Sequence, residues 1–427
     1  MTGKGRRLEL AEAAGLVRPR DTVACGFAAG EPVGLLDAIG ARPDLEDLTI
    51  LAGLLVHPHA VLGNPAVRVL SGFFGPIERA ARAQGARVQY LPVDFHGLER
   101  LGLRMRPRVV VAVTSPPDGE GWLSFGVSPA ASYRPFLEAA RDPDRLALAE
   151  VNVHMPRVDG LAEFGRNRVH LSEVDGWVEH AAELVTLPAG SPSPPELAIA
   201  RHVAALVDDG ATLQFGIGAI PDEVARLLAS CPRGDLGIHT EMVSDGVMRL
   251  HAAGKVTNRK GLYDGVSVGT FALGSPALYD WLGASPDVRM LPVGAVNDPA
   301  LMRKLRRFVS INGALAIDLA GQVAADHVAG RQYSGVGGHE AFVVSASEAP
   351  GGKSIVCLKS TATVAGERVT TIVPALPSGT LVTTPRHHLQ WVVTEHGAVD
   401  VSALGDADRA RALAGLADPA FRAGLAT

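Results

Sequence analysis

Short, almost continuously apolar runs recur along the first half of the chain, separated by longer stretches with helical spacing. The runs occupy residues 22–27, 48–54, 88–93, 109–115 and 146–152. Between two of them, PIERAARAQGA (76–86) has the apolar spacing of an amphipathic helix. Strands that are apolar on both faces are typical of a parallel sheet covered by helices. The pattern predicts an open α/β fold with a mainly parallel sheet.

A proline-rich segment separates this region from the second half of the chain. Residues 187–196 read LPAGSPSPPE, and proline neither continues a helix nor donates to a central strand. We predict an interdomain linker here, with one α/β domain over residues 1–187 and a second over residues 188–427. The pattern of the second half predicts a helix over 197–207 and strands over 212–217, 236–240, 288–293, 354–358, 381–383 and 391–394.

Composition narrows the class of protein. The 427 residues are 47% hydrophobic and 20% charged, which is ordinary for a folded protein, and the net charge of −5 argues against nucleic-acid binding. The three cysteines form no CxxC pair, and the N-terminal segment has no apolar core of a signal peptide. No apolar run approaches the roughly 18 residues of a membrane-spanning helix. We expect a cytoplasmic protein without a membrane segment.

The turn GIGAIP joins a predicted strand to a predicted helix. Its residues are Gly216, Ile217, Gly218, Ala219, Ile220 and Pro221. Glycine lets a ligand approach the backbone, proline suits a first helical turn, and the helix N-terminus offers N–H groups to an anion. A plain strand–helix turn fits equally well. A dinucleotide fold uses a similar turn, but the third glycine of its fingerprint and the following strand-end acid are absent.

Two acids follow predicted strands. Glu241 stands after the strand that runs into His239 and Thr240, and Glu395 stands in the segment WVVTEHG (391–397). Open α/β sheets build their sites at the carboxyl ends of strands. A carboxylate there acts as a base, a metal ligand or a nucleophile, and by position alone Glu241 also fits a helix cap.

A glycine cluster lies between these acids. Gly335, Val336, Gly337 and Gly338 can present backbone N–H groups to an oxyanion, or can simply form a loop with positive φ angles. The histidines of His57-Pro58-His59 and His387-His388 lack zinc-type spacing with other ligands, so we expect loop or surface histidines and no metal site. The motif GxxxxGK[ST] is absent, which argues against a P-loop nucleotidase.

Taken together, the chain resembles the acetyl-CoA hydrolase/transferase family, whose motifs occur here in family order over nearly the whole length. The matching segments are GEP (30–32), SPPDGEGWLSFGVS (115–128), AEVNVHMPR (149–157), GATLQFGIGAIPD (210–222), GIHTEMVSDGV (237–247), FVSINGALAIDLAGQV (308–323), RQYSGVGG (331–338), GGKSIVCLKSTA (351–362) and WVVTEHG (391–397).

The resemblance implies two related open α/β domains and an acyl-CoA:carboxylate CoA-transferase. It implies a homodimer or higher homo-oligomer, with coenzyme A as a substrate and no permanently bound cofactor. The resemblance also implies that Glu241 is the nucleophile, that Glu395 is a second acid that positions the reacting groups, and that Asn312 lies near the carboxylate substrate. It further places Gly337 and Gly338 at the oxyanion and thioester. The 216–221 turn, Gly335, Val336 and His339 are then expected to contact coenzyme A or substrate.

The chain departs from the family pattern at two places. His339-Glu340-Ala341-Phe342 stands where relatives commonly carry Gln-Val-Asp-Phe, and Thr371 stands in place of an arginine. His339 as a base would admit water and favour acyl-CoA hydrolysis, which is the main alternative. A nicotinamide-binding oxidoreductase built on the GIGAIP turn and a non-catalytic acyl-CoA-binding protein are the remaining alternatives.

Overall fold

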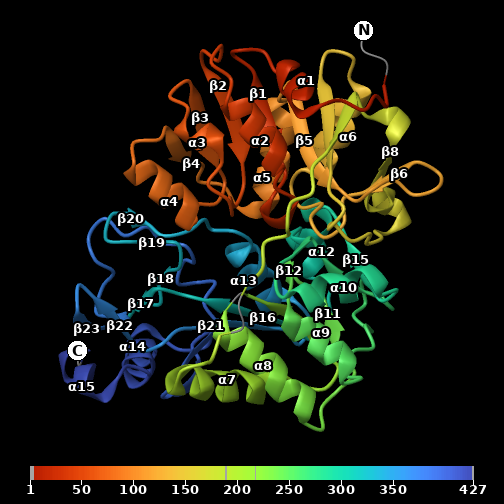
Figure 1. Cartoon of the computed structure of the whole chain (residues 1–427). Helices are drawn as coiled ribbons and strands as arrows, with labels where there is room; N and C mark the ends of the chain where they lie inside the picture. The colour runs from red at the N-terminus through yellow and green to blue at the C-terminus, as the bar shows by residue number, and fades with distance from the viewer. Residues whose placement is uncertain (1–3, 188–189, 217, 426–427) are drawn as a thin grey trace. The chain divides into compact units, whose positions relative to one another are not determined.

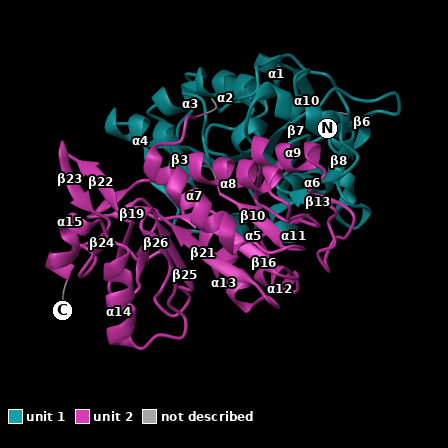
Figure 2. Ribbon diagram, turned by 90° about the horizontal axis from the view of Figure 1, so that it is seen from below, with its two compact units in different colours: residues 1–188, 268–296 teal, residues 189–267, 297–427 magenta. Residues whose placement is uncertain are grey.

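The computed structural model describes residues 4–187, 190–216 and 218–425. The chain forms two compact units, of which the first contains residues 1–188 and 268–296 and the second residues 189–267 and 297–427 (Figure 2). Residues 268–296 thus group with the first unit, whereas the sequence pattern assigns them to the second predicted domain.

Seven strands form the main sheet in the described part of the first unit, in the order β4-β3-β2-β1-β5-β7-β9. Every neighbouring pair is parallel. The chain builds outward from β1 to β4, then returns to β5 on the other side of β1, which is a doubly wound order. The strands are β1 (Thr22–Cys25), β2 (Leu48–Ala52), β3 (Val67–Ser71), β4 (Val88–Tyr90), β5 (Val109–Thr114), β7 (Leu146–Val151) and β9 (Gly176–Glu179).

Helices cover both faces of this sheet (Figure 1). Crossovers between parallel strands are right-handed, so a reversal of strand order moves the helices to the opposite face. The apolar residues of β2 and β5 are fully buried because they are covered on both sides. The helices in the described part of the first unit are α1 (Leu10–Gly15), α2 (Val33–Gly40), α3 (Ala60–Gly63), α4 (Pro76–Ala83), α5 (Phe95–Met105), α6 (Tyr133–Arg141), α10 (Pro276–Ala284) and α11 (Val293–Val296).

Shorter strands complete the first unit. β6 pairs with β8 in antiparallel fashion, and β13, which starts at the unit boundary, pairs with β15. Their bounds are β6 (Trp122–Ser124), β8 (Arg168–His170), β13 (Ser267–Gly269), β14 (Phe271–Ala272) and β15 (Val288–Met290).

The main sheet of the second unit has the order β11-β10-β16-β21-β25-β26 among the described residues. The first five strands are mutually parallel, and β26 adds an antiparallel edge. The strands are β10 (Thr212–Phe215), β11 (Gly237–Ile238), β16 (Phe308–Gly313), β21 (Lys353–Cys357), β25 (Trp391–Thr394) and β26 (Gly397–Asp400). Both units therefore confirm the predicted α/β fold with mainly parallel sheets.

The helices of the second unit form two groups. α7 packs on α8 and α8 on α9, whereas α13 packs on β16, β21 and α12. Their bounds are α7 (Pro194–Leu206), α8 (Ala219–Ser230), α9 (Asp245–Ala252), α12 (Pro299–Met302), α13 (His339–Glu348), α14 (Asp406–Gly415) and α15 (Pro419–Arg422). The short strands are β12 (Met242–Val243), β17 (Ala316–Asp318), β18 (Val323–Ala324), β19 (His327–Val328), β20 (Arg331–Gln332), β22 (Thr361–Val364), β23 (Glu367–Thr370) and β24 (Ile372–Val373).

The predicted linker is partly helical. Pro188 lies outside the described residues, but Pro194 and Pro195 form the first turn of α7 rather than a linker. Ser193 and Glu196 make a capping box at this helix start, and proline is well tolerated there because its missing N–H has no helical partner. Prolines that stop a helix and prolines that start one look alike in a sequence.

The strand prediction for residues 381–383 is wrong. These residues form no strand, and the side chains of Leu381 and Val382 are exposed. In the two main sheets the pattern missed β3, β9, β16 and β26. β3 alternates buried and half-buried residues, and β16 carries the polar Ser310 and Asn312. No helix of the described chain is long and apolar enough to cross a membrane.

Candidate active site

The parallel strands of the second unit end at one edge of the sheet, and the candidate residues lie in the segments at that edge. Because β11, β10, β16, β21 and β25 all run in the same direction, their carboxyl ends meet there. In sheet order, the edge presents Glu241 after β11, residues 216 and 218–221 after β10, Asn312 near the end of β16, Ser360 after β21 and Glu395 after β25. The fold therefore gathers residues from distant parts of the sequence.

A topological switch point lies between β10 and β16. From β10 the chain continues to β11 on one side, and from β16 it continues to β21 on the other. In open α/β sheets, the crevice at such a reversal is the usual place of ligand binding. The Gly216 N–H donates to the Ile311 carbonyl at 3.1 Å, which ties the GIGAIP turn to the end of β16 at this point.

Glu241 is held by a short, tightly bonded segment between β11 and α9. The hydroxyl of the preceding Thr240 is buried and accepts the Phe215 N–H at 3.2 Å, and it lies 3.1 Å from the Met242 carbonyl. After Met242 the chain enters α9 with Ser244 at the N-cap. The half-buried Glu241 side chain therefore projects from a fixed backbone at the sheet edge.

The carboxylate of Glu241 is oriented by Asn297. The Asn297 side-chain N–H donates to Glu241 Oε2 at 2.6 Å, and Asn297 itself is fully buried. Asp298, the next residue, caps α12 by accepting the Ala300 N–H at 2.8 Å, and Pro299 occupies the first turn of this helix. The sequence analysis missed Asn297. Its signal is the Asn-Asp-Pro run, which marks a rigid helix start.

Gly338 lies against the same carboxylate. A Cβ atom at this position would lie 2.1 Å from Glu241 Oε2 and 2.6 Å from Asn297 Nδ2. Contacts under about 3.0 Å force atoms to move, so only glycine fits beside the Glu241–Asn297 pair in this arrangement. The absence of a side chain here is thus a requirement of the carboxylate's position.

The glycine cluster leads into α13. Gly337 has φ +57°, which glycine adopts readily, and Gly338 is the N-cap of the helix. Gly335 is buried and Val336 half-buried in the preceding turn, where the Val336 carbonyl accepts the His339 N–H at 3.3 Å. The N-terminus of α13 carries a partial positive charge, which favours an anionic group beside it.

His339 is engaged elsewhere. Its buried ring places Nε2 3.0 Å from the Thr384 hydroxyl, and Thr384 donates to Glu340 at 2.6 Å. Burial lowers the pKa of His339 to about 4, despite the opposing field of Asp326. The imidazole is therefore neutral at pH 7, and its position is fixed by Thr384.

Asn312 lies in β16 next to β10, and its buried side chain contacts Gln214 weakly, with Oδ1 3.5 Å from Gln214 Nε2. Its Nδ2 makes no hydrogen bond among the described residues. A buried N–H group without an acceptor costs about 1–3 kcal/mol, so a ligand oxygen at this edge would be stabilised by it.

Glu395 binds a neighbouring loop with both oxygens. Its Oε1 accepts the Ser360 hydroxyl at 2.7 Å, and its Oε2 accepts the Ser360 N–H at 2.9 Å. The Thr371 N–H donates to the Ser360 carbonyl at 3.1 Å, and the Thr371 hydroxyl donates to the Lys359 carbonyl at 2.6 Å. Glu395 and Thr371 thus both hydrogen-bond to the loop after β21. Sequence reasoning did not single out Ser360.

The GIGAIP segment connects β10 to α8. Gly216 directly follows β10, Ile217 lies outside the described residues, and Gly218 is an exposed N-cap of α8 with φ +110°. Ala219 and Ile220 are half-buried in the first turn of α8, and Pro221 is buried. The structure brings together Glu241, Asn297 and Gly338 in direct contact. The described residues of the GIGAIP turn, Asn312 and Glu395 lie at the same edge of the sheet, and no contact between them and Glu241 is seen.

A doubly wound α/β fold with an oriented carboxylate at the carboxyl edge of its sheet is typical of an enzyme. Comparison with known proteins identifies the enzyme family. Residues 274–427 match the model of the acetyl-CoA hydrolase/transferase C-terminal domain. The chain is 37% identical to 4-hydroxybutyrate coenzyme A transferase of Clostridium kluyveri, over 94% of this chain and 92% of the relative.

A further relative and a solved structure are similar to the chain over nearly its whole length. Butyryl-CoA:acetate CoA-transferase of Anaerostipes caccae is 34% identical over 96% of this chain and 93% of its own length. The crystal structure of RipA from Yersinia pestis superposes with a TM-score of 0.90 and 35% identity, over 98% of this chain and 96% of that one. The chain belongs to the acetyl-CoA hydrolase/transferase family, as its motifs predict.

Proposed function

We propose that the protein is an acyl-CoA:carboxylate CoA-transferase and that Glu241 carries coenzyme A as a covalent glutamyl thioester. The observation that supports this most is the packing of the Glu241 carboxylate, which Asn297 orients and which has room only because residue 338 is glycine. An acid that served only to cap a helix would need neither feature. The relatives at 37% and 34% identity are themselves named CoA-transferases.

The first half-reaction moves coenzyme A onto the protein. A Glu241 oxygen attacks the thioester carbonyl of an acyl-CoA, a C–O bond forms and the C–S bond breaks, which gives an acyl–glutamyl anhydride and CoA thiolate. The thiolate then attacks the glutamyl carbonyl, which gives glutamyl-CoA and releases the acyl group as a carboxylate. Two such steps divide one difficult transfer into easier ones.

The second half-reaction reverses these steps with another carboxylate. The acceptor attacks the glutamyl-CoA carbonyl, the resulting thiolate attacks the acceptor's carbonyl in the anhydride, and Glu241 is regained as a carboxylate. No net proton transfer or external energy source is needed, because the thioester bond is exchanged and not hydrolysed.

Asn297 and the N-terminus of α13 suit this chemistry. Each attack on the glutamyl carbonyl places negative charge on an oxygen, and donors aimed at that oxygen stabilise the transition state. The Asn297 N–H already points at Oε2 of Glu241, and the dipole of α13 favours negative charge at the same place. Gly337 and Gly338 expose backbone at this helix end, and we assign them to the thioester region.

We assign the remaining residues by their place at the sheet edge. Asn312 offers its Nδ2 to the acyl or acceptor carboxylate, and the GIGAIP turn with Gly335 and Val336 contacts coenzyme A. Glu395 acts through Ser360, whose loop it holds with two hydrogen bonds. His339 is a positioning residue, since Thr384 occupies its Nε2.

Product analysis tests the reaction. Purified protein incubated with a short-chain acyl-CoA and a different carboxylate is expected to form the new acyl-CoA with ping-pong kinetics, and Glu241→Gln is expected to abolish it. Glu348→Gln, which alters an acid at the far end of α13, serves as the control. Thiol release at an equal rate with and without added carboxylate would instead identify an acyl-CoA hydrolase.

A further inference from the structure

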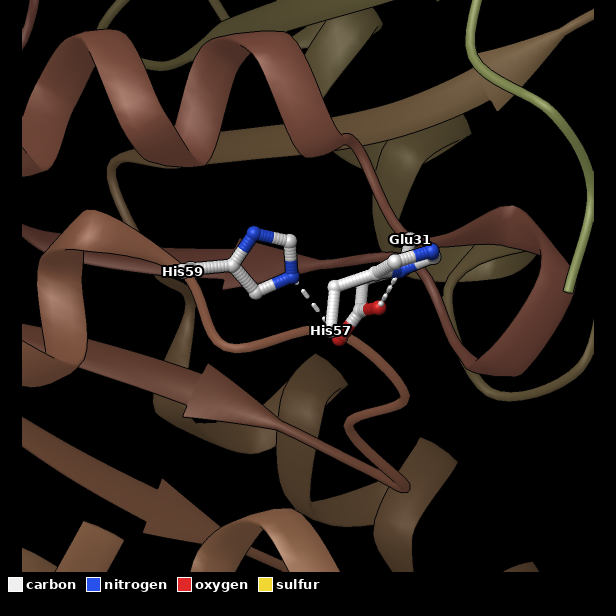
Figure 3. Close-up of side chains that lie close together, drawn as sticks. All are labelled: Glu31, His57 and His59. Atoms are coloured by element: carbon white, nitrogen blue, oxygen red, sulfur yellow. Dashed lines mark hydrogen bonds and ion pairs between the residues drawn. The ribbon is translucent and has the colours of Figure 1, made fainter.

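A second cluster of reactive side chains lies in the first unit, at the carboxyl edge of its sheet. Glu31 follows β1 and the short 3-10 helix Ala28–Gly30, and His57 and His59 lie in the loop between β2 and α3. Because β1 and β2 are parallel neighbours, the segments that follow them meet. Figure 3 shows both imidazole rings directed at the Glu31 carboxylate.

Each imidazole faces a different oxygen of Glu31. His57 Nδ1 lies 2.7 Å from Oε2, and His59 Nε2 lies 3.0 Å from Oε1. One donor atom from each of the three residues falls within 4.8 Å of the others. The Val56 N–H lies 3.2 Å from both carboxylate oxygens and fixes the carboxylate between the rings.

The cluster is buried, and His59 faces Glu31 and Asp37 without a well-formed hydrogen bond to either. The side chains of Glu31 and His59 are 1% and 0% exposed, whereas the side chain of His57 is 33% exposed. Neither ring nitrogen of His59 makes a hydrogen bond of acceptable geometry among the described residues. Buried polar atoms without partners are rare, and each costs about 1–3 kcal/mol. His59 lies in a loop, as one of the two expected placements has it, but it is buried and not at the surface.

A further acid stands behind His59. Asp37 of α2 places Oδ1 3.6 Å from His59 Nδ1, the nitrogen that faces away from Glu31. The same oxygen accepts the Ala60 N–H at 2.8 Å, which holds Asp37 in place. A carboxylate behind the second nitrogen of a histidine is the arrangement that orients metal-binding imidazoles.

We propose that Glu31, His57 and His59 bind a divalent transition-metal ion of the zinc type. Two imidazoles and one carboxylate form a three-residue zinc ligand set, with water in the fourth position. Tetrahedral zinc with bonds near 2.1 Å separates its ligand atoms by about 3.3–3.5 Å. The present separations from Glu31 are 2.7 and 3.0 Å, so small side-chain movements suffice.

The ion would join the segments that follow β1 and β2. It would take the lone pairs of His57 Nδ1 and His59 Nε2, and the proton now shared between His57 and Glu31 would pass to water. His59 Nδ1–H would then donate to Asp37. The half-exposed His57 provides the side of the cluster from which an ion can enter.

Zinc titration of the full-length, untagged protein tests the proposal without any activity assay. After treatment with a chelator, calorimetry with ZnCl2 is expected to show one binding event that raises the Tm. Glu31→Gln, His57→Ala and His59→Ala are expected to abolish this event. Asp37→Asn, which keeps the hydrogen bond to Ala60, is expected to weaken zinc binding about 10–100-fold.

His154→Ala is the matched control. His154 is a more exposed histidine of the same unit, 3.5 Å from Glu183, and no third ligand lies beside it among the described residues. This variant is expected to bind zinc like the unaltered protein. Because His59 is buried, its variant alone would not separate lost binding from misfolding, and His57→Ala decides that case. Equal zinc affinity in the unaltered protein and in His57→Ala would overturn the proposal, as would no zinc binding by the unaltered protein.

Discussion

The Asn297 side-chain N–H donates to Glu241 Oε2 at 2.6 Å, and this bond joins a residue at the start of α12 to the acid after β11. The two residues stand 56 positions apart in the sequence. The fully buried amide has no freedom to follow the carboxylate, so it fixes the direction in which Glu241 is presented. The predictions on activity that follow depend on this geometry.

Replacing Asn297 by alanine is expected to lower kcat about 10²–10³-fold, the usual effect of removing one oxyanion donor. Asn297→Asp, which keeps the shape but places a second negative charge beside Glu241, is expected to lower it at least as far. Steady-state kinetics of both variants, with circular dichroism to confirm folding, measures this. Activity within threefold of the unaltered enzyme would remove Asn297 from the mechanism.

Gly338→Ala is expected to lower kcat by about 10²-fold or more, because displacement of a reacting group by about 1 Å has effects of that size. The added Cβ would lie 2.1 Å from Glu241 Oε2. Gly234→Ala is the matched control, since a Cβ there meets no atom within 4 Å. If the two alanine variants were equally active, the close approach of Gly338 to the carboxylate would have no functional meaning.

Glu395 and Ser360 are expected to act as one unit. Both oxygens of Glu395 accept hydrogen bonds from Ser360, so removal of either side chain frees the same loop. Glu395→Ala and Ser360→Ala are each expected to lower kcat/KM. The double variant is expected to have a kcat/KM only slightly below that of the less active single variant. A double-mutant cycle measures this coupling. Independent, additive effects would show that Glu395 does not work through Ser360.

His339 is expected to make the protein sensitive to acid. Burial lowers the pKa of His339 to about 4 in the folded protein, from an ordinary value of 6.5. Between these values the unfolded chain binds the proton more readily, so stability falls as the pH falls from about 6.5 towards 4, by up to roughly 3 kcal/mol.

Denaturant unfolding at pH 7 and pH 4.5 checks this expectation. His339→Gln is expected to lose less stability between the two pH values than the unaltered protein loses, whereas His387→Gln, a change at an exposed ring, is expected to leave the loss unchanged. Parallel behaviour of the two variants would show that His339 is not the group that titrates.

The sequence predicts those parts of the fold that rest on local, continuous patterns. β2, β5 and β25 lie inside predicted strands because they are buried on both faces or contain a full apolar run. The apolar pattern does not predict β16, because Ser310 and Asn312 interrupt its apolar run, although this strand is central in its sheet. The burial of such polar residues is decided by tertiary neighbours, which periodicity does not reveal.

The sequence likewise predicts some residues of the candidate site and misses others. Glu241 and the glycine cluster stand out because family motifs surround them, and the strand-end position of Glu241 follows from local pattern. Asn297, Ser360 and Thr384 act only through partners 35 to 56 positions away. His59 was assigned to a loop or the surface because its partners Glu31 and Asp37 come from other elements. These relationships require the folded chain.

Mass spectrometry of the protein after brief incubation with an acyl-CoA tests the covalent mechanism most directly. The account predicts that one coenzyme A is added per chain, as a thioester located on the peptide that contains Glu241, and that an acceptor carboxylate removes it. In Glu241→Gln neither the adduct nor transfer should appear. Transfer that continues in Glu241→Gln, or an adduct on another residue of the unaltered protein, would contradict the account.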